Sequence, residues 1–374
     1  MTEARLTRLR ETFAEQQLDA LFVSDPFNRR YLSGFTGTAG QLLITPGEAV
    51  IATDFRYWEQ AGRQCPRFRL YQTAGAMADW LSGLFAGLGG KRLGFEAASL
   101  SFADYQQIVK LIEGLPPRER PQFVSTENLV EQLRAVKDAD EIAAMERVVA
   151  LGDAAFNHAA ALIRPGWTEL QAVRAIENYI KDHGGEGTSF TTIVAGGARG
   201  AMPHARAGHD LLREGEGVVI DMGALLDGYC SDMTRTIFLG TPDARFNAIY
   251  DIVLTAQQTA EVLIEPGMTG EMAHRIAHKV IEEAGYGEHF GHGLGHGIGL
   301  QIHEAPWLKA TSDSVLQEGM VFSVEPGIYI SGWGGVRIED LVVLENGRCR
   351  VLSKAPKLHV SHLTRVTRVT GVPG

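Results

Sequence analysis

Residues 162–168 read Leu-Ile-Arg-Pro-Gly-Trp-Thr, and 101 positions later residues 263–269 read Leu-Ile-Glu-Pro-Gly-Met-Thr. The agreement continues at the same offset, so that nine of 23 positions match between the two copies. In each copy the pattern is typical of a helix that ends at Pro-Gly and of a second helix capped by the threonine. A long repeat of this kind indicates two similar units that pack around a shared centre. We therefore predict a pseudo-twofold domain in the second half of the chain.

Each copy of the repeat is followed by predicted strands that carry acidic residues. Asp221 ends a Val-Val-Ile-Asp run after the first copy, and Asp232 follows eleven residues later. After the second copy, Glu325 stands in Val-Glu-Pro-Gly and Glu339 in Arg-Ile-Glu-Asp. A carboxylate on a buried strand is costly unless a cation or hydrogen bonds compensate its charge. Four such carboxylates together predict a multivalent cation.

A glycine-rich run lies between these strands, and residues 291–299 read Gly-His-Gly-Leu-Gly-His-Gly-Ile-Gly. Its glycines allow backbone and imidazole groups to approach a crowded site, and its histidines offer a nitrogen ligand. The glycine spacing does not fit the G-x-G-x-x-G dinucleotide loop. The chain also lacks a Gly-Lys-Ser/Thr loop, an H-E-x-x-H helix and a G-x-S-x-G turn. These observations exclude phosphate-loop, zincin and serine-hydrolase mechanisms.

The second half resembles the metallopeptidase family of prolidase, aminopeptidase P and methionine aminopeptidase from about residue 137 to 345. The family's five metal ligands match, in order and local context, Asp221, Asp232, His296, Glu325 and Glu339. The resemblance implies a pita-bread fold and two divalent metal ions, for which this donor set suits manganese first and cobalt or zinc next. It also implies that Glu325 carries a proton from a water between the ions to the leaving nitrogen.

Four further residues resemble side chains that line the family's substrate pocket, namely His204, His292, His303 and Arg337. By this resemblance His204 and His303 are catalytic as well, because they polarise the scissile carbonyl or hold the substrate. Asp340 should face away from Glu339, since neighbouring residues of a strand point to opposite faces. We expect six other histidines at the surface: His158, His183, His209, His274, His278 and His289.

The first half predicts a separate α/β domain, so the chain should consist of domains at residues 1–134 and 135–374. Apolar runs indicate strands at residues 21–23, 42–44, 50–52 and 91–95. Helical patterns cover residues 54–64, 76–87 and 101–113. The Pro- and charge-rich residues 114–121 form a loop or a linker. Asp138 and Glu141 then form the capping box of a long helix.

Residues 31–40 and 51–61 resemble the N-terminal domain of aminopeptidase P proteins. The resemblance implies a creatinase-like α/β domain that roofs the active site and helps to form a homodimer. Methionine aminopeptidases lack such a domain, and creatinase lacks the metal ligands. The chain therefore looks like a peptidase that removes an N-terminal residue in front of a proline.

Three functions follow from this resemblance. The first is an Xaa-Pro aminopeptidase that acts on longer peptides, which we prefer because of residues 31–40 and 51–61. The alternative is an Xaa-Pro dipeptidase, or prolidase, with the same mechanism. A peptide-binding pseudoenzyme is the remote alternative, since it would require a lost ligand. Proline-containing peptides are the expected partners.

Composition sets limits on other partners and on the compartment. A net charge of −10 opposes binding to nucleic acids and anionic membranes, and no run approaches the ~18 apolar residues of a membrane span. The first residues lack the apolar core of a secretory signal, and the odd set of three cysteines gives no disulfide framework. We expect a cytoplasmic protein with reduced cysteines. Residues 361–366 show no clear element.

Overall fold

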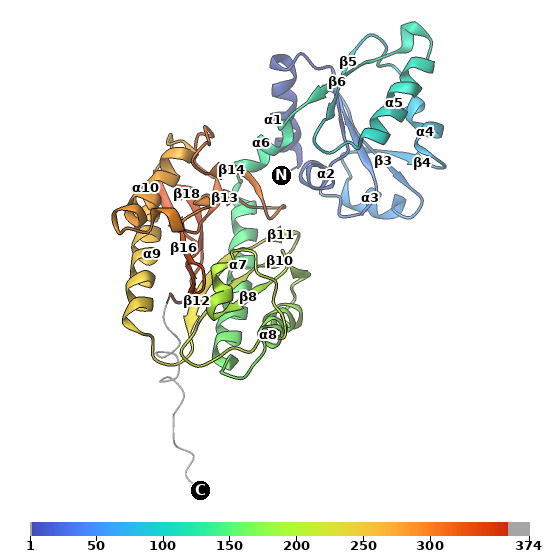
Figure 1. Ribbon diagram of the computed structural model, residues 1–374. Helices are drawn as coiled ribbons and strands as arrows, with labels where there is room; N and C mark the ends of the chain where they lie inside the picture. The colour runs from blue at the N-terminus through green and yellow to red at the C-terminus, as the bar shows by residue number, and fades with distance from the viewer. Residues whose placement is uncertain (1, 358–374) are drawn as a thin grey trace. The chain divides into compact units, whose positions relative to one another are not determined.

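The computed structural model describes residues 2–357, and the chain divides into two compact units (Figure 1). The first unit ends at Arg134 and the second begins at Ala135. Residues 361–366, for which the sequence predicts no element, lie outside the described residues.

The first unit is built on a six-stranded mixed sheet in the order β4-β3-β2-β1-β5-β6. Its strands are β1 Ala20–Val23, β2 Gln41–Ile44, β3 Ala49–Asp54, β4 Arg69–Thr73, β5 Arg92–Glu96 and β6 Gln122–Thr126. The helices are α1 Thr2–Glu15, α2 Pro26–Ser33, α3 Trp58–Gln64, α4 Met77–Leu84, α5 Phe102–Gly114 and α6 Leu129–Ala135. The neighbours β1, β2 and β3 are antiparallel, and the outer pairs are parallel. The predicted α/β character is thereby confirmed.

The elements predicted for the first unit are present, and the structure adds helices α2 and α6, which were not predicted. Helix α3 begins only at Trp58, because a turn in which Asp54 accepts from Arg56 follows β3. Strands β4 and β6 were not predicted, since they lie at the two edges of the sheet and four of the five residues in each are exposed or partly exposed. Residues 114–121, predicted as a loop or a linker, form the connection from α5 to β6 within the unit, with a 3₁₀ turn at Pro117–Glu119.

The repeat of the second unit consists of two helical pairs. They are α7 Ala139–Leu162 with α8 Glu169–Asp182, and α9 Ala244–Leu263 with α10 Gly270–Glu283. Thr168 and Thr269 cap the second helix of each pair, as predicted, and each accepts a backbone N–H of the first turn. Asp138 and Glu141 form the predicted capping box of α7. The two pairs lie on opposite sides of the strands in Figure 1.

Two sheets between these helices carry the candidate site. The first sheet has the order β12-β9-β8 and the second β14-β13-β15-β18-β19, and smaller sheets join β11-β10-β7 and β16-β17. The strands are β7 Gly187–Thr188, β8 Ile193–Gly196, β9 Gly217–Met222, β10 Ala224–Leu226, β11 Tyr229–Cys230, β12 Met233–Phe238, β13 Gly295–Gly297, β14 Glu304–Leu308, β15 Val321–Val324, β16 Gly327–Ile330, β17 Gly334–Arg337, β18 Asp340–Glu345 and β19 Arg348–Val351. Short 3₁₀ turns cover Pro117–Glu119, Gly197–Ala201 and Gly287–His289.

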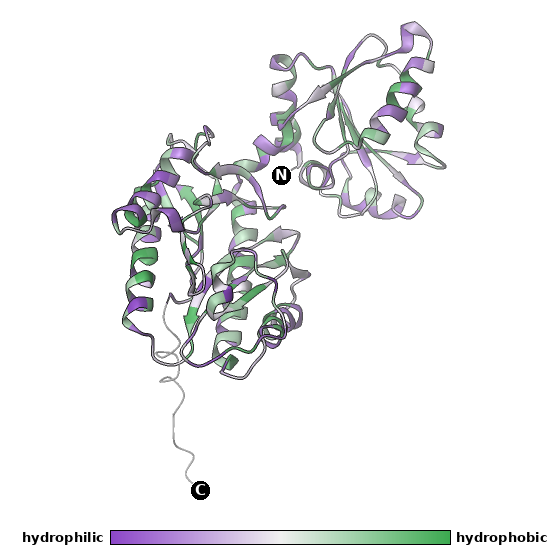
Figure 2. Ribbon diagram, in the orientation of Figure 1, coloured by the Kyte–Doolittle hydropathy of each residue, from purple (hydrophilic) through white to green (hydrophobic). Residues whose placement is uncertain are grey.

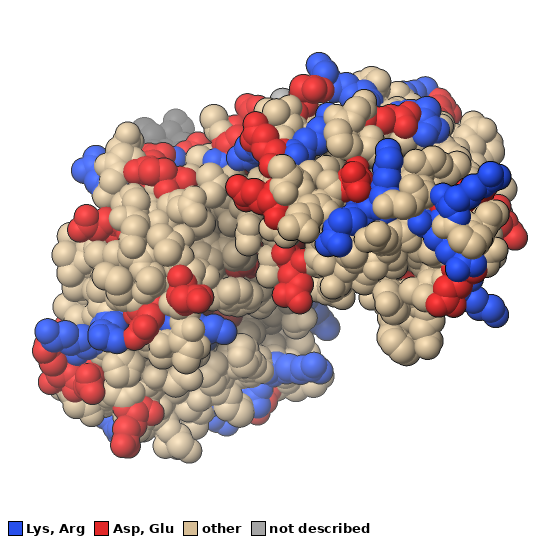
Figure 3. Space-filling model, turned by 90° about the horizontal axis from the view of Figure 1, so that it is seen from above, with Lys and Arg blue, Asp and Glu red and all other residues tan. Residues whose placement is uncertain are grey.

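Apolar side chains concentrate on the strands and on the inner faces of the helices in both units (Figure 2). Acidic and basic side chains are interspersed on the face shown in Figure 3. Among residues 2–357, no helix is both long and apolar enough to cross a bilayer. All three cysteines are free thiols, with Cys65 and Cys230 buried.

Candidate functional site

All nine predicted site residues line one pocket of about 950 Å³. The described lining of this pocket lies between residues 190 and 339, which all belong to the second unit. Strand β9 carries Asp221, and Asp232 directly precedes β12. Strand β13 carries His296, Glu325 directly follows β15, and Glu339 directly precedes β18. Both halves of the repeat thus contribute a pair of acids to one place.

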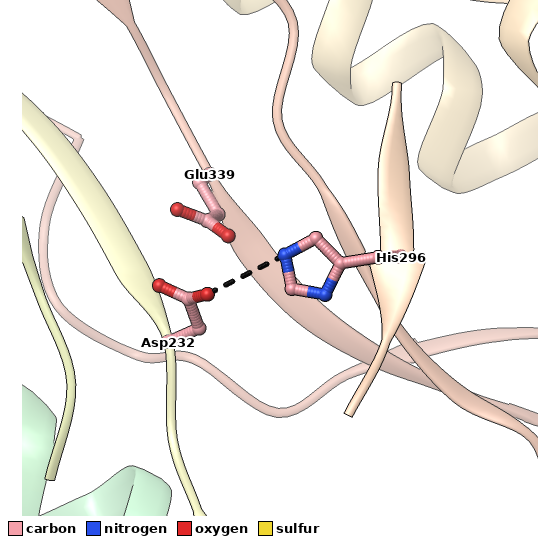
Figure 4. Close-up of side chains that lie close together, drawn as sticks. All are labelled: Asp232, His296 and Glu339. Carbon is pink, nitrogen blue, oxygen red and sulfur yellow. Dashed lines mark ion pairs between the residues drawn. The ribbon is translucent and has the colours of Figure 1, made fainter. Parts of the chain in front are cut away.

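Three of these residues form a compact cluster, which Figure 4 shows. One ligand atom from each of Asp232, His296 and Glu339 lies within 4.8 Å of the other two. The Nε2 atom of His296 lies 3.6 Å from an Asp232 oxygen and 3.5 Å from a Glu325 oxygen. Glu325 therefore joins the cluster through the same imidazole nitrogen.

Asp221, on strand β9, also lines this pocket. Its Oδ2 accepts a bond of 2.6 Å from Arg337, while its Oδ1 is buried and has no hydrogen-bond partner among the described residues. The Oε1 atom of Glu339 is buried and unpartnered in the same way. Because an unpaired buried carboxylate oxygen is costly, these two atoms fit a bound cation.

The electrostatics of the cluster also fit a cation. Burial, together with the charges of Glu339 and Asp221, raises the pKa of Asp232 well above its ordinary value. Burial and the charge of Glu325 raise the pKa of Glu339 in the same direction. Carboxylates crowded in a dry site repel one another, and a divalent ion removes that repulsion.

The orientation of His296 presents a lone pair to the acids. Its Nδ1 lies 3.0 Å from the carbonyl oxygen of Gly297, so that this nitrogen carries the proton and donates it. Burial lowers the pKa of His296, which favours the neutral ring. The free Nε2 therefore faces Asp232 and Glu325 as a ligand nitrogen would.

The two glycines beside His296 permit this placement. A Cβ atom at Gly295 would lie 1.9 Å from the Ser323 carbonyl oxygen, and one at Gly297 would lie 2.0 Å from that of Ala305. Since both obstacles are backbone atoms, no side-chain rotation can relieve the contact. The close approach of three strands thus requires glycine at both positions.

Two buried hydroxyl groups that the sequence analysis missed hold the acids in place. Thr234 donates to Glu339 at 2.7 Å and accepts from Nε of Arg337 at 2.9 Å. Ser323 accepts from the backbone N–H of His296 at 3.0 Å and donates to Glu325 at 3.1 Å. Each hydroxyl lies two residues from a predicted ligand on the same strand face. Residues two positions apart on a strand point to the same face, so this spacing could have predicted both hydroxyl groups from the sequence.

Tyr329 is another missed residue of the pocket. Its hydroxyl lies 2.8 Å from Nη1 of Arg337 and 2.9 Å from Nε2 of His292. The other nitrogen of His292 lies 2.7 Å from the carbonyl oxygen of Gly293. Burial raises the pKa of Tyr329 to about 12, so the hydroxyl stays protonated. Both nitrogens of His292 are thus engaged by the protein, and the ring shapes the pocket wall.

His204 and His303 are exposed to the pocket. The ring of His303 meets that of His296 edge-on at 4.3 Å between centroids, and burial lowers its pKa. One of the histidines expected at the surface differs from that prediction. His274 is buried against Phe290, because it lies on the inner face of α10. His289 is exposed, as expected, and also lines the pocket.

Asp340 points away from the pocket, as predicted, into a buried ionic network. It pairs with Arg235 at 2.6 Å and with Lys357 at 2.5 Å. Arg235 also donates to the carbonyl oxygens of Glu339 and Ala355. This network fixes the backbone of Glu339 from behind.

Comparisons with known proteins agree with this geometry. Residues 143–346 match the family model of metallopeptidase family M24, and residues 5–136 match that of the creatinase/prolidase N-terminal domain. The structure is similar to that of the Xaa-Pro dipeptidase from Bacillus anthracis, with 41% identity, a TM-score of 0.90 and coverage of 96% of this chain and 99% of that one.

Two other relatives are similar over nearly their whole length. The Xaa-Pro dipeptidase of Pyrococcus furiosus is 36% identical over 93% of this chain and 97% of its own. The X-Pro aminopeptidase from Thermotoga maritima is 34% identical, with a TM-score of 0.86 and coverage of 95% and 98%.

Proposed function

Since the chain belongs to metallopeptidase family M24, we propose that it is an Xaa-Pro dipeptidase that uses two divalent metal ions. Membership of this family makes the chain a metallo-exopeptidase. The observation that carries the proposal is the similarity, at 41% identity over 96% of the chain, to a structure described as an Xaa-Pro dipeptidase. The sequence alone favours an Xaa-Pro aminopeptidase, with the Xaa-Pro dipeptidase as its alternative. The comparisons support this alternative better, because the similar X-Pro aminopeptidase is only 34% identical.

The metal ligands in this proposal are Asp221, Asp232, His296, Glu325 and Glu339. The unpartnered oxygens of Asp221 and Glu339, and the free Nε2 of His296, support it. Two bound ions supply Lewis acidity for the scissile carbonyl and an activated water. Manganese is our preferred metal, since hard carboxylates dominate the donor set.

The remaining roles belong to the chain's own side chains. Glu325 is suited to hold and pass on a proton, because burial raises its pKa and Ser323 orients its carboxylate. His204 and His303 face the pocket and can donate to the scissile carbonyl oxygen. Arg337 holds Asp221 in position, and His292 with Tyr329 forms the wall beside it.

We also propose a cytoplasmic homodimer. The free thiols of Cys65, Cys230 and Cys349 support a reducing compartment. The match of residues 5–136 to the creatinase/prolidase N-terminal domain supports the dimer, by the resemblance described above. Size-exclusion chromatography with light scattering would test the assembly.

Steady-state kinetics on matched peptides test the dipeptidase function. We expect the manganese-loaded protein to hydrolyse Ala-Pro with at least about tenfold higher kcat/KM than Ala-Pro-Ala, a ratio that corresponds to about 1.4 kcal/mol of transition-state binding. The reverse preference would make the protein an aminopeptidase. Absence of hydrolysis of both peptides by metal-loaded protein would support the pseudoenzyme.

A further inference from the structure

The first turn of helix α8 contains a buried carboxylate, that of Glu169, whose side chain is only 1% exposed. Its Oε1 accepts from the backbone N–H of Gly196 at 3.1 Å and from Nε of Arg199 at 2.9 Å. Its Oε2 accepts from the backbone N–H of Gly208 at 3.0 Å. These bonds offset the cost of burying the charge. Both oxygens thus bind one stretch of chain, residues 196–208, at its beginning and at its end.

Arg199 extends this contact into the middle of the stretch. Its Nε donates to Glu169, while its Nη2 donates to the carbonyl oxygen of Arg206 at 2.6 Å. One guanidinium therefore connects the carboxylate on α8 to the backbone two residues after His204. Asp210 also pairs with Arg199, at 3.5 Å, but its side chain is 59% exposed, and such a pair contributes little.

The ring of His204 depends on this backbone for its position. Its imidazole faces the pocket and has no hydrogen-bond partner within residues 2–357. The start of the stretch is fixed by packing, because a Cβ atom at Gly335 would lie 2.1 Å from the carbonyl oxygen of Gly200. Further along, Met202, His204 and Arg206 are exposed. Polar contacts with the Glu169–Arg199 pair therefore replace apolar packing around His204.

The second copy of the repeat builds the same helix start without a carboxylate. Gly270 takes the place of Glu169 at the offset of 101 residues. The backbone N–H of Glu169 donates to the Asp210 carbonyl at 3.0 Å, and that of Gly270 donates to the Ser314 carbonyl at 2.9 Å. The fold of the repeat thus does not require the acid. Its distinct contacts are those with the stretch that carries His204.

We propose that Glu169 and Arg199 are positioning residues, which hold the backbone of residues 202–208 so that His204 meets the scissile carbonyl. The inference rests on the proposed function, in which His204 donates to that carbonyl oxygen. A misplacement of roughly 1 Å can cost about 100-fold in rate, so a contact remote from the reacting atoms can matter.

A double-mutant cycle tests the connection between the pair and His204. Glu169→Gln should lower kcat on Ala-Pro, or on Ala-Pro-Ala if that is the better substrate, by about tenfold or more without loss of bound metal. In a chain that already carries His204→Ala, the same change should alter kcat by less than about twofold, because the group it positions is absent. Arg199→Met should behave in the same way. Asp210→Asn is the matched control and should leave kcat within about twofold of the wild type.

Amide hydrogen exchange of the metal-loaded protein tests the contact without any use of activity. In Glu169→Gln and in Arg199→Met, residues 202–208 should exchange about tenfold faster than in the wild type, since local opening becomes easier. Asp210→Asn should leave this exchange unchanged. Circular dichroism shows whether each variant is folded. If Glu169→Gln does not fold, Arg199→Met carries the same test, because Glu169 then keeps its bonds to Gly196 and Gly208.

The outcomes separate this inference from the proposed function. Unchanged exchange of residues 202–208 in both variants overturns the inference. Full, additive losses of kcat in the double variant also overturn it, because the pair would then act independently of His204. A wild-type protein that hydrolyses neither peptide overturns the proposed function instead. Exchange alone then decides whether the Glu169–Arg199 pair holds this stretch of backbone.

Discussion

The hydroxyl of Thr234 donates to Glu339 at 2.7 Å, although the two residues lie 105 positions apart and come from different halves of the repeat. The same oxygen accepts from Arg337, which in turn holds Asp221. One buried threonine thus connects acids from both halves of the site.

Thr234→Val should weaken metal binding without unfolding the protein, because valine keeps the shape and loses both hydrogen bonds. Loss of a group that orients a metal ligand commonly costs about 10 to 100-fold in metal affinity. Calorimetric titration of metal-free protein with manganese measures this loss. Thr234→Ser should retain most of the manganese affinity, because serine keeps the hydroxyl. If the wild type and both variants bind manganese equally well, Thr234 does not orient a metal ligand.

Metal removal should abolish peptide hydrolysis, and manganese or cobalt should restore it. The metal-free protein should also melt at a lower temperature, because the crowded carboxylates of Asp232 and Glu339 then repel each other. Asp232→Ala should remain folded and leave little activity. Full activity in protein that is metal-free by elemental analysis would contradict the two-metal mechanism.

His204→Ala should lower kcat and leave the metal content unchanged. A donor to the developing oxyanion is typically worth about 10² to 10³ in kcat. His209→Ala is the matched control, because His209 is also exposed and is absent from the described lining of the pocket. Loss of metal together with rate would make His204 a ligand or a structural residue instead.

Glu96 in the first unit should make stability depend on pH. Burial raises the pKa of its carboxyl to about 7, although Asp25, Asn28 and Ser24 donate hydrogen bonds to it. The folded protein therefore binds this proton more tightly than the unfolded chain does. Its contribution is most favourable below the unfolded value of 4.5 and declines as the pH rises to about 7.

Glu96→Gln should flatten this decline. Denaturant unfolding of the metal-free protein at pH 5 and pH 8 measures it, and the variant should lose less stability between these values than the wild type. Glu127→Gln, at an exposed carboxyl, serves as the control. A variant that behaves like the control at both pH values would show that the Glu96 carboxyl does not titrate in this range.

The repeat and the acids on its strands are signals that can be read directly along the sequence, and they predicted the fold of the second unit. The nine site residues chosen from the sequence all line one pocket of the structure. The prediction from sequence missed Tyr329, whose partners His292 and Arg337 become visible only once β16 and β17 pair. It also placed His274 at the surface, since a single histidine on an amphipathic helix gives no sign of which face it occupies. Such residues depend on contacts between distant segments, which no window of the sequence contains.

The close contacts at Gly295 and Gly297 affect how natural substitutions at these two positions should be interpreted. A single base change converts a glycine codon to an alanine codon, and a scale of side-chain similarity ranks that exchange as mild. At these two positions the added methyl group would meet a backbone carbonyl oxygen at 1.9 or 2.0 Å and would push His296 away from its acids. An allele of this kind would retain every catalytic side chain and still encode an inactive peptidase.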